Sequence, residues 1–534
     1  MDLPATRPSR ARLLRDCALP LLFALFAAAC STLRKDYVKT PSTALPPASD
    51  TPSARYVQGE VRQHGALSGF RLLTRSNNAL MSRVALIDHA AHSVDLQYYI
   101  FEDDDTGRLI AQRLLAAADR GVRVRLLLDD MPLDQKDPFF DALDAHANIE
   151  VRRFNPFNTS SPSLPSKIAQ FIVEGQRLNR RMHNKSFIVD GNVAIVGGRN
   201  IGDAYFDASG DTNFRDLDVV AIGSVVGQAA VAFDKYWNSD AAFPVAAFTD
   251  HQGSDAQLAK LRVQLKEHSR AFAETDYAQE AQQELPNGPT ADRRGQWFWG
   301  EGELVADEPE KIEAKKDEPA FRIGPKIKTI LDAAQSQVLL TTPYFIPGKS
   351  GTAYLTGIAS RGVEVEALTN SLASTDEPAA HAGYASYRRA LLEGGVKLFE
   401  LRPAVGGKQP ATAYGTSSGV ALHAKSIVVD KRYVFVGSMN IDQRSKLLNT
   451  EMGVIVDCPP LAAAVAEFFG KAIAPSSSFR VTLADAKDGH PAGRMQWISQ
   501  EADKPVIVDS EPEATAARRL EVNLLRLLPL EGLL

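Results

Sequence analysis

Two segments in different halves of the chain carry the same set of residues that could do chemistry on a phosphate. The segments are MHNKSFIVDGNVAIVGGRN, which begins at Met182, and LHAKSIVVDKRYVFVGSMN, which begins at Leu422. In each segment a histidine is followed two residues later by a lysine, as His183 and Lys185, and as His423 and Lys425. The residues after each lysine are β-branched or apolar, which is typical of a strand. Residues i and i+2 of a strand share a face, so we expect each histidine and lysine to point to the same place.

This combination suits the cleavage or transfer of a phosphodiester. A phosphodiester is negatively charged, and its transition state places further charge on the equatorial oxygens. Two lysines and two asparagines around one phosphate would supply cations and fixed donors there without a metal. One imidazole can attack phosphorus, and the other can protonate the leaving alkoxide and then deprotonate the acceptor. Neither histidine belongs to a dense cluster of metal-ligating residues, so we predict no metal and no cofactor.

The elements that must position these residues can be read from the same segments. Asp190 and Asp430 each end a strand at a turn, and we expect them to stabilise that turn rather than touch substrate. A second strand follows in each segment and leads to small residues, Gly197-Gly198 and Gly437-Ser438. Small residues allow the backbone and the next side chains to approach a ligand closely. We therefore predict that Asn200, Asn440 and Ser438 bind substrate.

A second pair of matched segments indicates an internal duplication. Strand–helix–strand units are predicted over Val94–Phe101, Leu109–Asp119 and Arg123–Leu128, and over Val338–Phe345, Ala353–Ala359 and Glu364–Leu368. In both units a glycine, Gly121 or Gly362, follows the helix and suits a left-handed C-cap. Each half is therefore expected to form an α/β lobe with a largely buried sheet.

The paired segments resemble the duplicated HKD motif of the phospholipase D superfamily. The runs Gly197–Phe206, Gly437–Ser445 and Leu524–Glu531 resemble bacterial cardiolipin synthases, in particular the C-type subgroup. This resemblance implies two lobes related by a pseudo-two-fold axis, each a mixed β-sheet flanked by helices, with one shared active-site cleft.

The resemblance also implies roles for individual residues. In this family the histidine, lysine and aspartate of both motifs make up the catalytic set, which here is His183, Lys185, Asp190, His423, Lys425 and Asp430. We take His183 as the nucleophile and His423 as the acid/base, although the near-symmetric motifs leave the reverse assignment open. An acidic residue further on orients a catalytic histidine in the family. Glu451 fits this position in the second half, and Asp216 fits it in the first half after a short insertion.

The N-terminus predicts export. An arginine-bearing stretch precedes the apolar run Ala18–Ala29, which is too short to span a bilayer and suits a signal peptide over residues 1–29. Cys30 follows small residues, so it is a candidate for lipidation at the periplasmic side of a membrane. Cleavage after Ala29 by an ordinary signal peptidase remains the alternative. Cys458 would then be the one other cysteine left, and we expect a buried, inert thiol.

Composition divides the rest of the chain. We predict a flexible tether over 30–64, a first lobe over 65–249, a helical and charged connector over 250–318, and a second lobe over 319–534. Trp297–Trp299 is expected to be a strand edge, with a membrane-facing patch as the alternative. Asn155–Pro165 is predicted to be a loop, either a lid or a plain surface connection. The helix predicted over Arg518–Leu528 is expected to pack on the second lobe, with membrane contact as the alternative.

The leading functional prediction is a phosphatidyltransferase that makes cardiolipin from phosphatidylglycerol, with phosphatidylethanolamine as a further candidate lipid. Hydrolysis of phospholipids to phosphatidic acid would use the same residues. A periplasmic nuclease is a third hypothesis, but a formal net charge of −5 argues against nucleic acid as a partner. A scaffold without activity is the fourth, and the two intact motifs argue against it.

Overall fold

The two halves of the chain form two mixed β-sheets that join edge to edge. The computed structural model describes residues 37–131, 137–157, 174–248, 253–284, 297–312, 318–403, 419–484, 493–501 and 504–527. In the first lobe the strands lie in the order β9–β4–β3–β2–β5–β6–β8–β1. Their bounds are β1 Ser68–Leu73, β2 Ser93–Tyr98, β3 Arg123–Asp129, β4 Ile149–Phe154, β5 Ser186–Val189, β6 Val193–Gly197, β8 Asp218–Ile222 and β9 Ala242–Pro244.

The second lobe repeats this order. Its strands run β17–β16–β15–β11–β12–β13–β18–β19–β20, so β11, β12 and β13 take the places of the parallel strands β2, β3 and β4. The bounds are β11 Gln337–Thr341, β12 Glu364–Asn370, β13 Lys397–Leu401, β15 Ser426–Val429, β16 Tyr433–Gly437, β17 Met452–Asp457, β18 Ser478–Leu483, β19 Met495–Glu501 and β20 Lys504–Val508. Strand β10, Phe298–Ala306, pairs with both β1 and β17 and thereby joins the two sheets.

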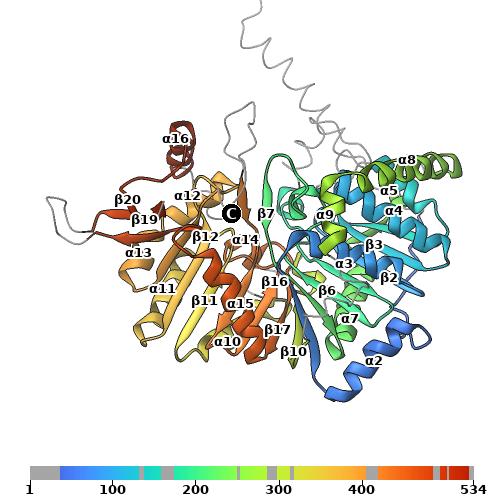
Figure 1. Cartoon of the computed structure of the whole chain (residues 1–534), viewed down its shortest axis with the longest axis horizontal. Coiled ribbons are helices and arrows are strands. Elements are labelled where there is room, and N and C mark those ends of the chain that lie inside the picture. Colours follow the sequence, from blue (N-terminus) through green and yellow to red (C-terminus); the bar gives the residue numbers. More distant parts are fainter. Residues whose placement is uncertain are drawn as a thin grey trace, which may run out of the picture.

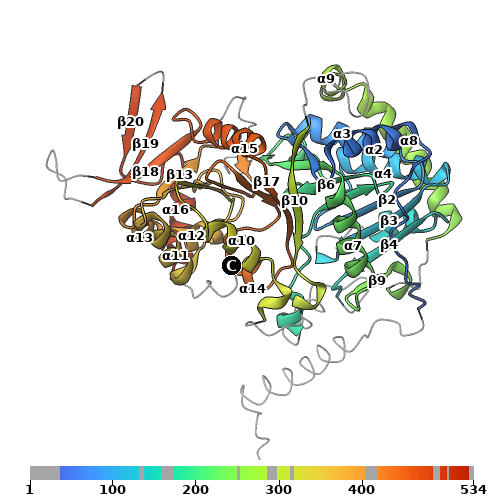
Figure 2. The same cartoon turned by 90° about the horizontal axis from the view of Figure 1, so that it is seen from below.

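Helices cover both faces of each sheet because alternate strand residues point to opposite sides. On β15, Ile427 and Val429 pack into the core beneath α10 (Gly324–Asp332) and α11 (Gly348–Ser360), whereas Val428 packs on the side of α15 (Pro459–Ala472). In the first lobe α3 (Ser76–Asp88), α4 (Asp105–Asp119) and α5 (Asp137–Asp144) cover one face and α7 (Ser224–Asn238) covers the other (Figures 1 and 2). The fold is therefore the predicted pair of α/β lobes.

The predicted strand–helix–strand repeat is confirmed in both halves, as β2–α4–β3 and β11–α11–β12. The glycines after the two helices have the positive φ expected of a C-cap, +94° at Gly121 and +87° at Gly362. One hydrophobic core crosses between the lobes. It contains Phe70 and Val219 of the first lobe, packed with Val436 and Val454 of the second.

The flexible tether predicted over residues 30–64 is wrong from residue 37 onward. Residues 37–50 lie along the first lobe, and α2 (Pro52–His64) follows them. The backbone carbonyls of Thr40, Ser42 and Thr43 accept hydrogen bonds from arginines of β3 and β4. His64 stacks on Trp299 with the ring centroids 3.7 Å apart. Partners that lie far away along the chain therefore order a segment whose composition is typical of a linker.

The connector predicted over 250–318 also divides differently. Helices α8 (Asp255–Ala273) and α9 (Asp276–Glu284) belong to the first lobe, because Leu258, Leu261 and Leu265 of α8 lie in its core. Residues 298–306 form strand β10 rather than a solvated linker. The strand predicted at Trp297–Trp299 is confirmed from Phe298 onward, and Trp297, directly before it, is buried.

Cys458 is buried, and its thiol lies 3.4 Å from the carbonyl oxygen of Trp299, as expected of an inert cysteine. Helix α16 (Ala516–Leu525) packs on α12 (Pro378–Ala385) of the second lobe through Val522, as predicted. The leader 1–29, Cys30 and residues 158–165 of the predicted lid lie outside the described residues. Among the described residues, no helix is both long and apolar enough to span a bilayer.

Candidate active site

The backbone that leads into each histidine is paired with the other lobe. Met182 forms a parallel bridge with Thr450, and the N–H of His183 donates to the carbonyl of Thr450 at 2.9 Å. In the same way β14 (Val420–Leu422) pairs with β7 (Asn213–Arg215), and the N–H of His423 donates to the carbonyl of Arg215 at 2.9 Å. The two arrangements match the expected pseudo-two-fold relation, and they bring both histidines to the interface between the lobes.

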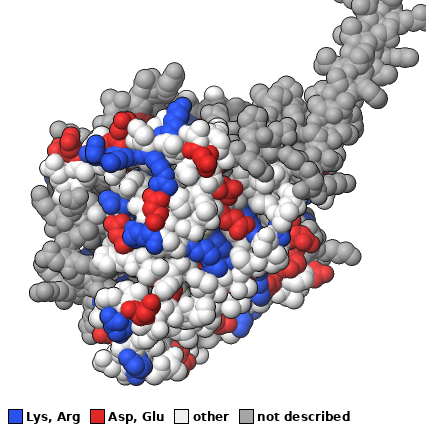
Figure 3. Space-filling view, turned by 90° about the vertical axis from the view of Figure 1, so that its right-hand side faces the viewer, with Lys and Arg blue, Asp and Glu red and all other residues white. Residues whose placement is uncertain are grey.

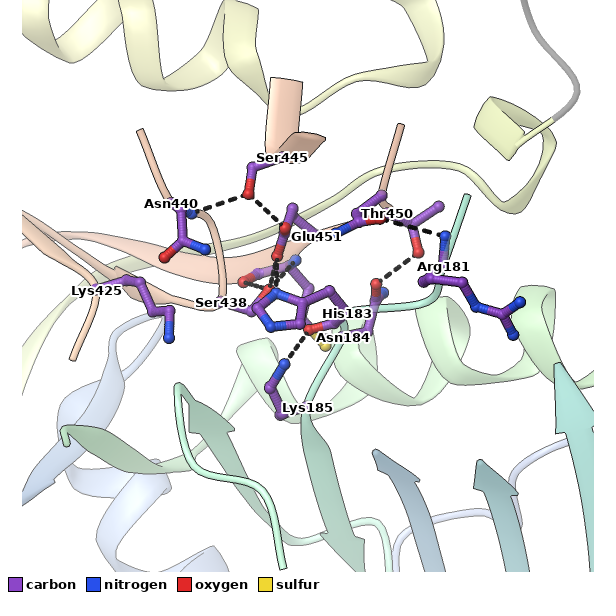
Figure 4. Close-up of polar contacts among 12 residues, drawn as sticks. Arg181, His183, Asn184, Lys185, Lys425, Ser438, Asn440, Ser445, Thr450 and Glu451 are labelled. Carbon is purple, nitrogen blue, oxygen red and sulfur yellow. Dashed lines mark hydrogen bonds and ion pairs between the residues drawn. The ribbon is translucent and has the colours of Figure 1, made fainter. Parts of the chain in front are cut away.

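Each histidine is held by a carboxylate from the opposite lobe. Nδ1 of His183 lies 2.8 Å from Oε2 of Glu451, and Nδ1 of His423 lies 2.6 Å from Oδ2 of Asp216. Figure 4 shows Glu451 between Ser445 and the His183 ring. A carboxylate oxygen accepts, so Nδ1 carries the hydrogen and the lone pair of Nε2 is left free to act on a substrate.

The two lysines lie in the same buried site. Nζ of Lys185 donates to the carbonyl of His183 at 2.7 Å, and Nζ of Lys425 donates to the carbonyl of His423 at 2.6 Å. Both side chains lie near the His183 ring although they come from different lobes (Figure 4). Burial lowers the pKa of Lys425 to about 8 and holds the pKa of Lys185 well below its usual value. The charge of each lysine therefore depends on the carboxylates and on any bound anion.

Both imidazoles are neutral in the free protein at neutral pH. Burial, together with Lys185 and Lys425, holds the pKa of His183 well below its usual value. Burial and Lys425 lower the pKa of His423 to about 4, although Asp216 opposes this effect. The ring of His183 meets Tyr99 edge-on at 5.3 Å, and that of His423 meets Tyr205 at 5.2 Å, so both rings are fixed by aromatic walls.

The two carboxylates are supported by different cations. In the first half the buried Arg199 donates to the carbonyl of Asp216 at 2.9 Å. Burial opposes ionisation of Asp216, but His423, Lys425 and Arg199 hold its pKa below the usual value. Met439 takes the place of Arg199 in the second half.

In the second half, the cation that supports Glu451 comes from the segment after β10. Lys311 pairs with Asp307 at 2.7 Å, and Asp307 accepts a hydrogen bond from the backbone N–H of Glu451 at 2.8 Å. Burial raises the pKa of Glu451 to about 7, although Lys185 and the hydroxyls of Ser438 and Ser445 act to lower this pKa. Sequence reasoning did not identify Asp307, Lys311 or Ser445. Ser445 stands in a run that had been matched to the family, which is the one signal that could have marked it.

The two predicted substrate-binding asparagines reach the same site with part of their amides unused. Oδ1 of Asn200 accepts from the backbone N–H of Ile100 at 3.2 Å, and the Asn200 side chain lies beside the Tyr205 hydroxyl. Oδ1 of Asn440 is buried and has no hydrogen-bond partner within the described part of the chain. Buried amides with spare capacity are suited to contact a ligand.

Asp190 and Asp430, which belong to the family's catalytic set, lie away from the histidines. The Asp190 carboxylate accepts from the backbone N–H groups of residues 91–93 at 2.8 to 2.9 Å. Asp430 accepts in the same way from residues 335–337. Both aspartates have positive φ, +51° and +52°. Each carboxylate fixes the turn after its strand to the start of the neighbouring strand, which supports the turn-holding role, and the place of both aspartates in the catalytic set stays a prediction.

The hydroxyl of Ser438 makes hydrogen bonds within the second lobe. It donates to Oε2 of Glu451 and accepts from the N–H of Met452 at 3.0 Å. The matching position in the first half is Gly198, where a Cβ atom would lie 2.2 Å from Oδ1 of Asp216. The residue at this position therefore supports the acid, and substrate contact by Ser438 stays a prediction.

The charged side chains on the end face of the first lobe are of both signs (Figure 3). Lys and Arg alternate there with Asp and Glu (Figure 3). In this lobe Arg262 of α8 pairs with Asp119 of α4, and Arg108 of α4 pairs with Asp103, which lies just before that helix. A nucleic-acid surface needs clustered cations, and this face does not supply them.

Comparison with known proteins agrees with this geometry. A family model described as "Cardiolipin synthase, PLD-like domain" matches residues 84–237 and 327–473, one stretch in each lobe. Cardiolipin synthase C of Escherichia coli K12 is 38% identical over 477 residues, which cover 88% of this chain and 97% of that protein. A cardiolipin synthase of Staphylococcus aureus Mu50 is 24% identical over 397 residues, which cover 73% of this chain and 64% of that protein.

Among solved structures, the phosphatidylserine synthase of Haemophilus influenzae Rd KW20 has the same fold. The TM-score is 0.53 at 14% identity, over 79% of this chain and 91% of that one. Duplicated motifs, two equivalent sheets and crossed histidine–carboxylate pairs thus accompany a family match in both lobes. The chain belongs to the phospholipase D superfamily of enzymes, in the family of the cardiolipin synthase PLD-like domain.

Proposed function

We propose that this enzyme is a phosphatidyltransferase that forms cardiolipin, acting through a covalent phosphatidyl-histidine. The observation that carries the proposal is the crossed orientation of the two imidazoles, each held at Nδ1 by the other lobe's carboxylate. That arrangement leaves two Nε2 atoms for one phosphate, as a double displacement needs.

In the first step Nε2 of His183 attacks the phosphorus of a donor phospholipid. The bond from phosphorus to the headgroup oxygen breaks, and His423 protonates that oxygen as it leaves. A bound phosphodiester anion favours the protonated imidazolium and so raises the low pKa of His423 toward that of a working acid. Lys185 and Lys425 carry the charge that balances the phosphoryl oxygens.

In the second step a hydroxyl of phosphatidylglycerol gives its proton to His423, and its oxygen attacks phosphorus. The bond between phosphorus and His183 breaks, which releases cardiolipin and leaves His183 neutral and His423 protonated, as they were when the first step began. Water as the acceptor would give phosphatidic acid instead. The similarity to the E. coli cardiolipin synthase C over most of both chains favours a lipid acceptor.

The proposal places the enzyme at a membrane on the periplasmic side, held by a lipid on Cys30. Several acyl chains on Cys30 would anchor it firmly, because each buried methylene contributes about 0.8 kcal/mol. Mass spectrometry of the mature N-terminus tests this placement. A free, unmodified Cys30 or a mature chain that begins elsewhere would contradict it.

One assay tests the reaction. Purified enzyme is incubated with phosphatidylglycerol, with and without phosphatidylethanolamine, and cardiolipin, phosphatidic acid and released headgroup are resolved. Cardiolipin is expected. Phosphatidic acid alone would identify a hydrolase, and the absence of lipid turnover would remove the proposal.

His183→Ala and His423→Ala are expected to abolish turnover, because neither half-reaction can proceed without both imidazoles. Trapping with labelled lipid should give a phosphorylated adduct that is lost in His183→Ala. An adduct that persists in His183→Ala but not in His423→Ala would reverse the two roles. Retained turnover in both variants would remove the paired-histidine mechanism. Circular dichroism controls for folding.

A further inference from the structure

Helix α16 has an apolar side that packs and a second apolar side that faces solvent. Val522 is buried against Leu372 and Ala382 of the second lobe. On the other side Leu520, Leu524 and Leu527 are 61%, 57% and 81% exposed. Leu520 and Leu524 lie one helical turn apart on α16, and Leu527 follows in the turn after the helix ends, where its N–H donates to the carbonyl of Leu524, so the three side chains form one stripe. We call them the leucine stripe.

Helix α16 contacts a segment that leads toward the active site. Arg518 of α16 donates to the backbone carbonyl of Thr375, in the segment that follows the carboxyl end of β12. The next residue, Asp376, accepts a hydrogen bond from Tyr344 at 2.9 Å, and its charge raises the pKa of Lys425. One short segment thus connects α16 to the catalytic lysine. Figure 1 shows α16 standing out beyond α12.

The start of the described chain lies at the same edge of the sheets. Tyr37 contacts Phe243 of β9, with ring centroids 6.0 Å apart, and β9 pairs with the carboxyl half of β4. The chain then runs toward the amino ends of β3 and β2, where Thr43 meets Arg123. Cys30 precedes Tyr37 by a few residues, which span at most about 25 Å. A lipid on Cys30 would therefore enter a bilayer within about 25 Å of Tyr37.

We infer that the leucine stripe of α16 is a docking surface for a phospholipid bilayer, which brings the mouth of the site to its lipid substrates. The inference rests on the proposed function, whose substrates are dissolved in a membrane. The exposed surface of three leucine side chains is far smaller than the roughly 1,000 Å² of surface that a specific protein–protein interface buries. A few apolar side chains are enough for an interfacial helix, and the exposed Arg526 suits anionic headgroups.

A polarity-sensitive dye tests this placement. The full-length chain carrying Leu524→Cys, or Val263→Cys as the control, is labelled with nitrobenzoxadiazole and reconstituted in vesicles of phosphatidylethanolamine and phosphatidylglycerol. The two positions are matched, being 57% and 56% exposed. The unsubstituted chain, in which Cys458 is buried, gives the labelling background.

At position 524 the dye is expected to be quenched by nitroxide-labelled phospholipid and shielded from iodide in the water. At position 263 it is expected to be quenched by iodide and not by the labelled phospholipid. Free access of iodide to position 524 would overturn the inference. Shielding from iodide without quenching by the labelled lipid would also overturn it, because a second copy or another part of this chain would then cover the stripe.

Kinetics separate docking from chemistry. Leu520→Ser/Leu524→Ser is expected to raise KM for vesicle substrate roughly tenfold, while kcat and turnover of short-chain, monomeric phosphatidylglycerol stay unchanged. The matched pair Val231→Ser/Val263→Ser should leave all of these values unchanged. Equal effects of the two pairs would contradict docking by α16. If the unsubstituted enzyme turns over no lipid, the proposed function fails, while the dye experiment still reports the docking.

Discussion

At the scale of single residues, the two acids are not interchangeable. Asp216 binds His423 and lies so close to Gly198 that no Cβ atom fits there. Glu451 has a side chain longer by one methylene, binds His183 and accepts a hydrogen bond from Ser438. Glycine therefore stands beside Asp216, and the serine hydroxyl stands beside Glu451. The difference between Gly198 in the first half and Ser438 in the second is therefore explained by the space beside Asp216.

Gly198→Ser is expected to lower kcat roughly a hundredfold, because the new Cβ must displace the Asp216 carboxylate and so release His423 from its orientation. KM should change little, since lysines and asparagines remain. Gly210→Ser is the control, because a Cβ at that position meets nothing within 4 Å. A Gly198→Ser enzyme with normal kcat would show that the Asp216 contact does not control His423.

The pH dependence should report Lys425. Because its pKa is about 8 in the free enzyme, kcat/KM is expected to fall as pH rises through that value and the cation is lost. A bound phosphate anion favours the protonated lysine, so the corresponding fall in kcat should lie at higher pH. Profiles of both constants from about pH 5 to about pH 10 give the comparison. Lys425→Arg should move the alkaline limb of its residual activity upward, and an unmoved limb would assign it to another group.

At the scale of elements, Asp190 and Asp430 should stabilise the fold without taking part in the reaction. Asp430→Ala removes an acceptor for three backbone N–H groups and leaves alanine at a φ of +52°. We expect the free energy of unfolding to fall by about 2–3 kcal/mol, measured by urea denaturation. Asp430→Asn keeps one oxygen and tolerates this φ, so it should lose less. Loss of kcat in fully folded Asp430→Ala would return the residue to the catalytic set.

The sequence was sufficient for those elements whose signals are local. The repeat β2–α4–β3 and β11–α11–β12 follows from hydrophobic patterning and from one glycine after each helix. The motif strands follow from alternation after Lys185 and Lys425. Residues 37–50 were not predictable, because they are ordered by arginines on β3 and β4 that no local pattern reveals.

The candidate site was predictable only in part for the same reason. The histidines, lysines and asparagines stand in the motifs, but the crossing of the acids joins His183 to Glu451 and His423 to Asp216 across 268 and 207 residues. The Asp307–Lys311 pair lies in a stretch whose charge density is typical of a linker. Contacts between distant segments depend on how the lobes meet, which spacing along the chain does not give.

At the scale of the whole molecule, the active site exists only when the lobes are joined. Both histidine–carboxylate pairs cross the interface, β10 joins the two main sheets by pairing with β1 and β17, and β7 pairs with β14 across the lobes. Any change in how β10 sits between the lobes would therefore alter both pairs at once. Unfolding should accordingly be one transition rather than two.

Gly302 in the middle of β10 tests this coupling. A Cβ atom there would lie 2.5 Å from the Phe70 ring and 2.9 Å from Val225, both of which belong to the core shared by the lobes. Gly302→Ala is expected to lower the free energy of unfolding by about 1–3 kcal/mol, since packed cores resist added volume. Activity should fall as well, because a displaced β10 shifts the lobes and with them both histidine–carboxylate pairs.

The control is Gly357→Ala in α11, where a Cβ meets nothing within 4 Å. An alanine there should stabilise by about 0.4–1 kcal/mol and leave kcat unchanged. Thermal unfolding followed by calorimetry, with kcat measured on the same samples, compares the two variants. If Gly302→Ala lowers stability but leaves kcat intact, the lobes tolerate movement at β10. Two resolved transitions would show that each lobe is stable by itself and that the crossed pairs contribute little to holding them together.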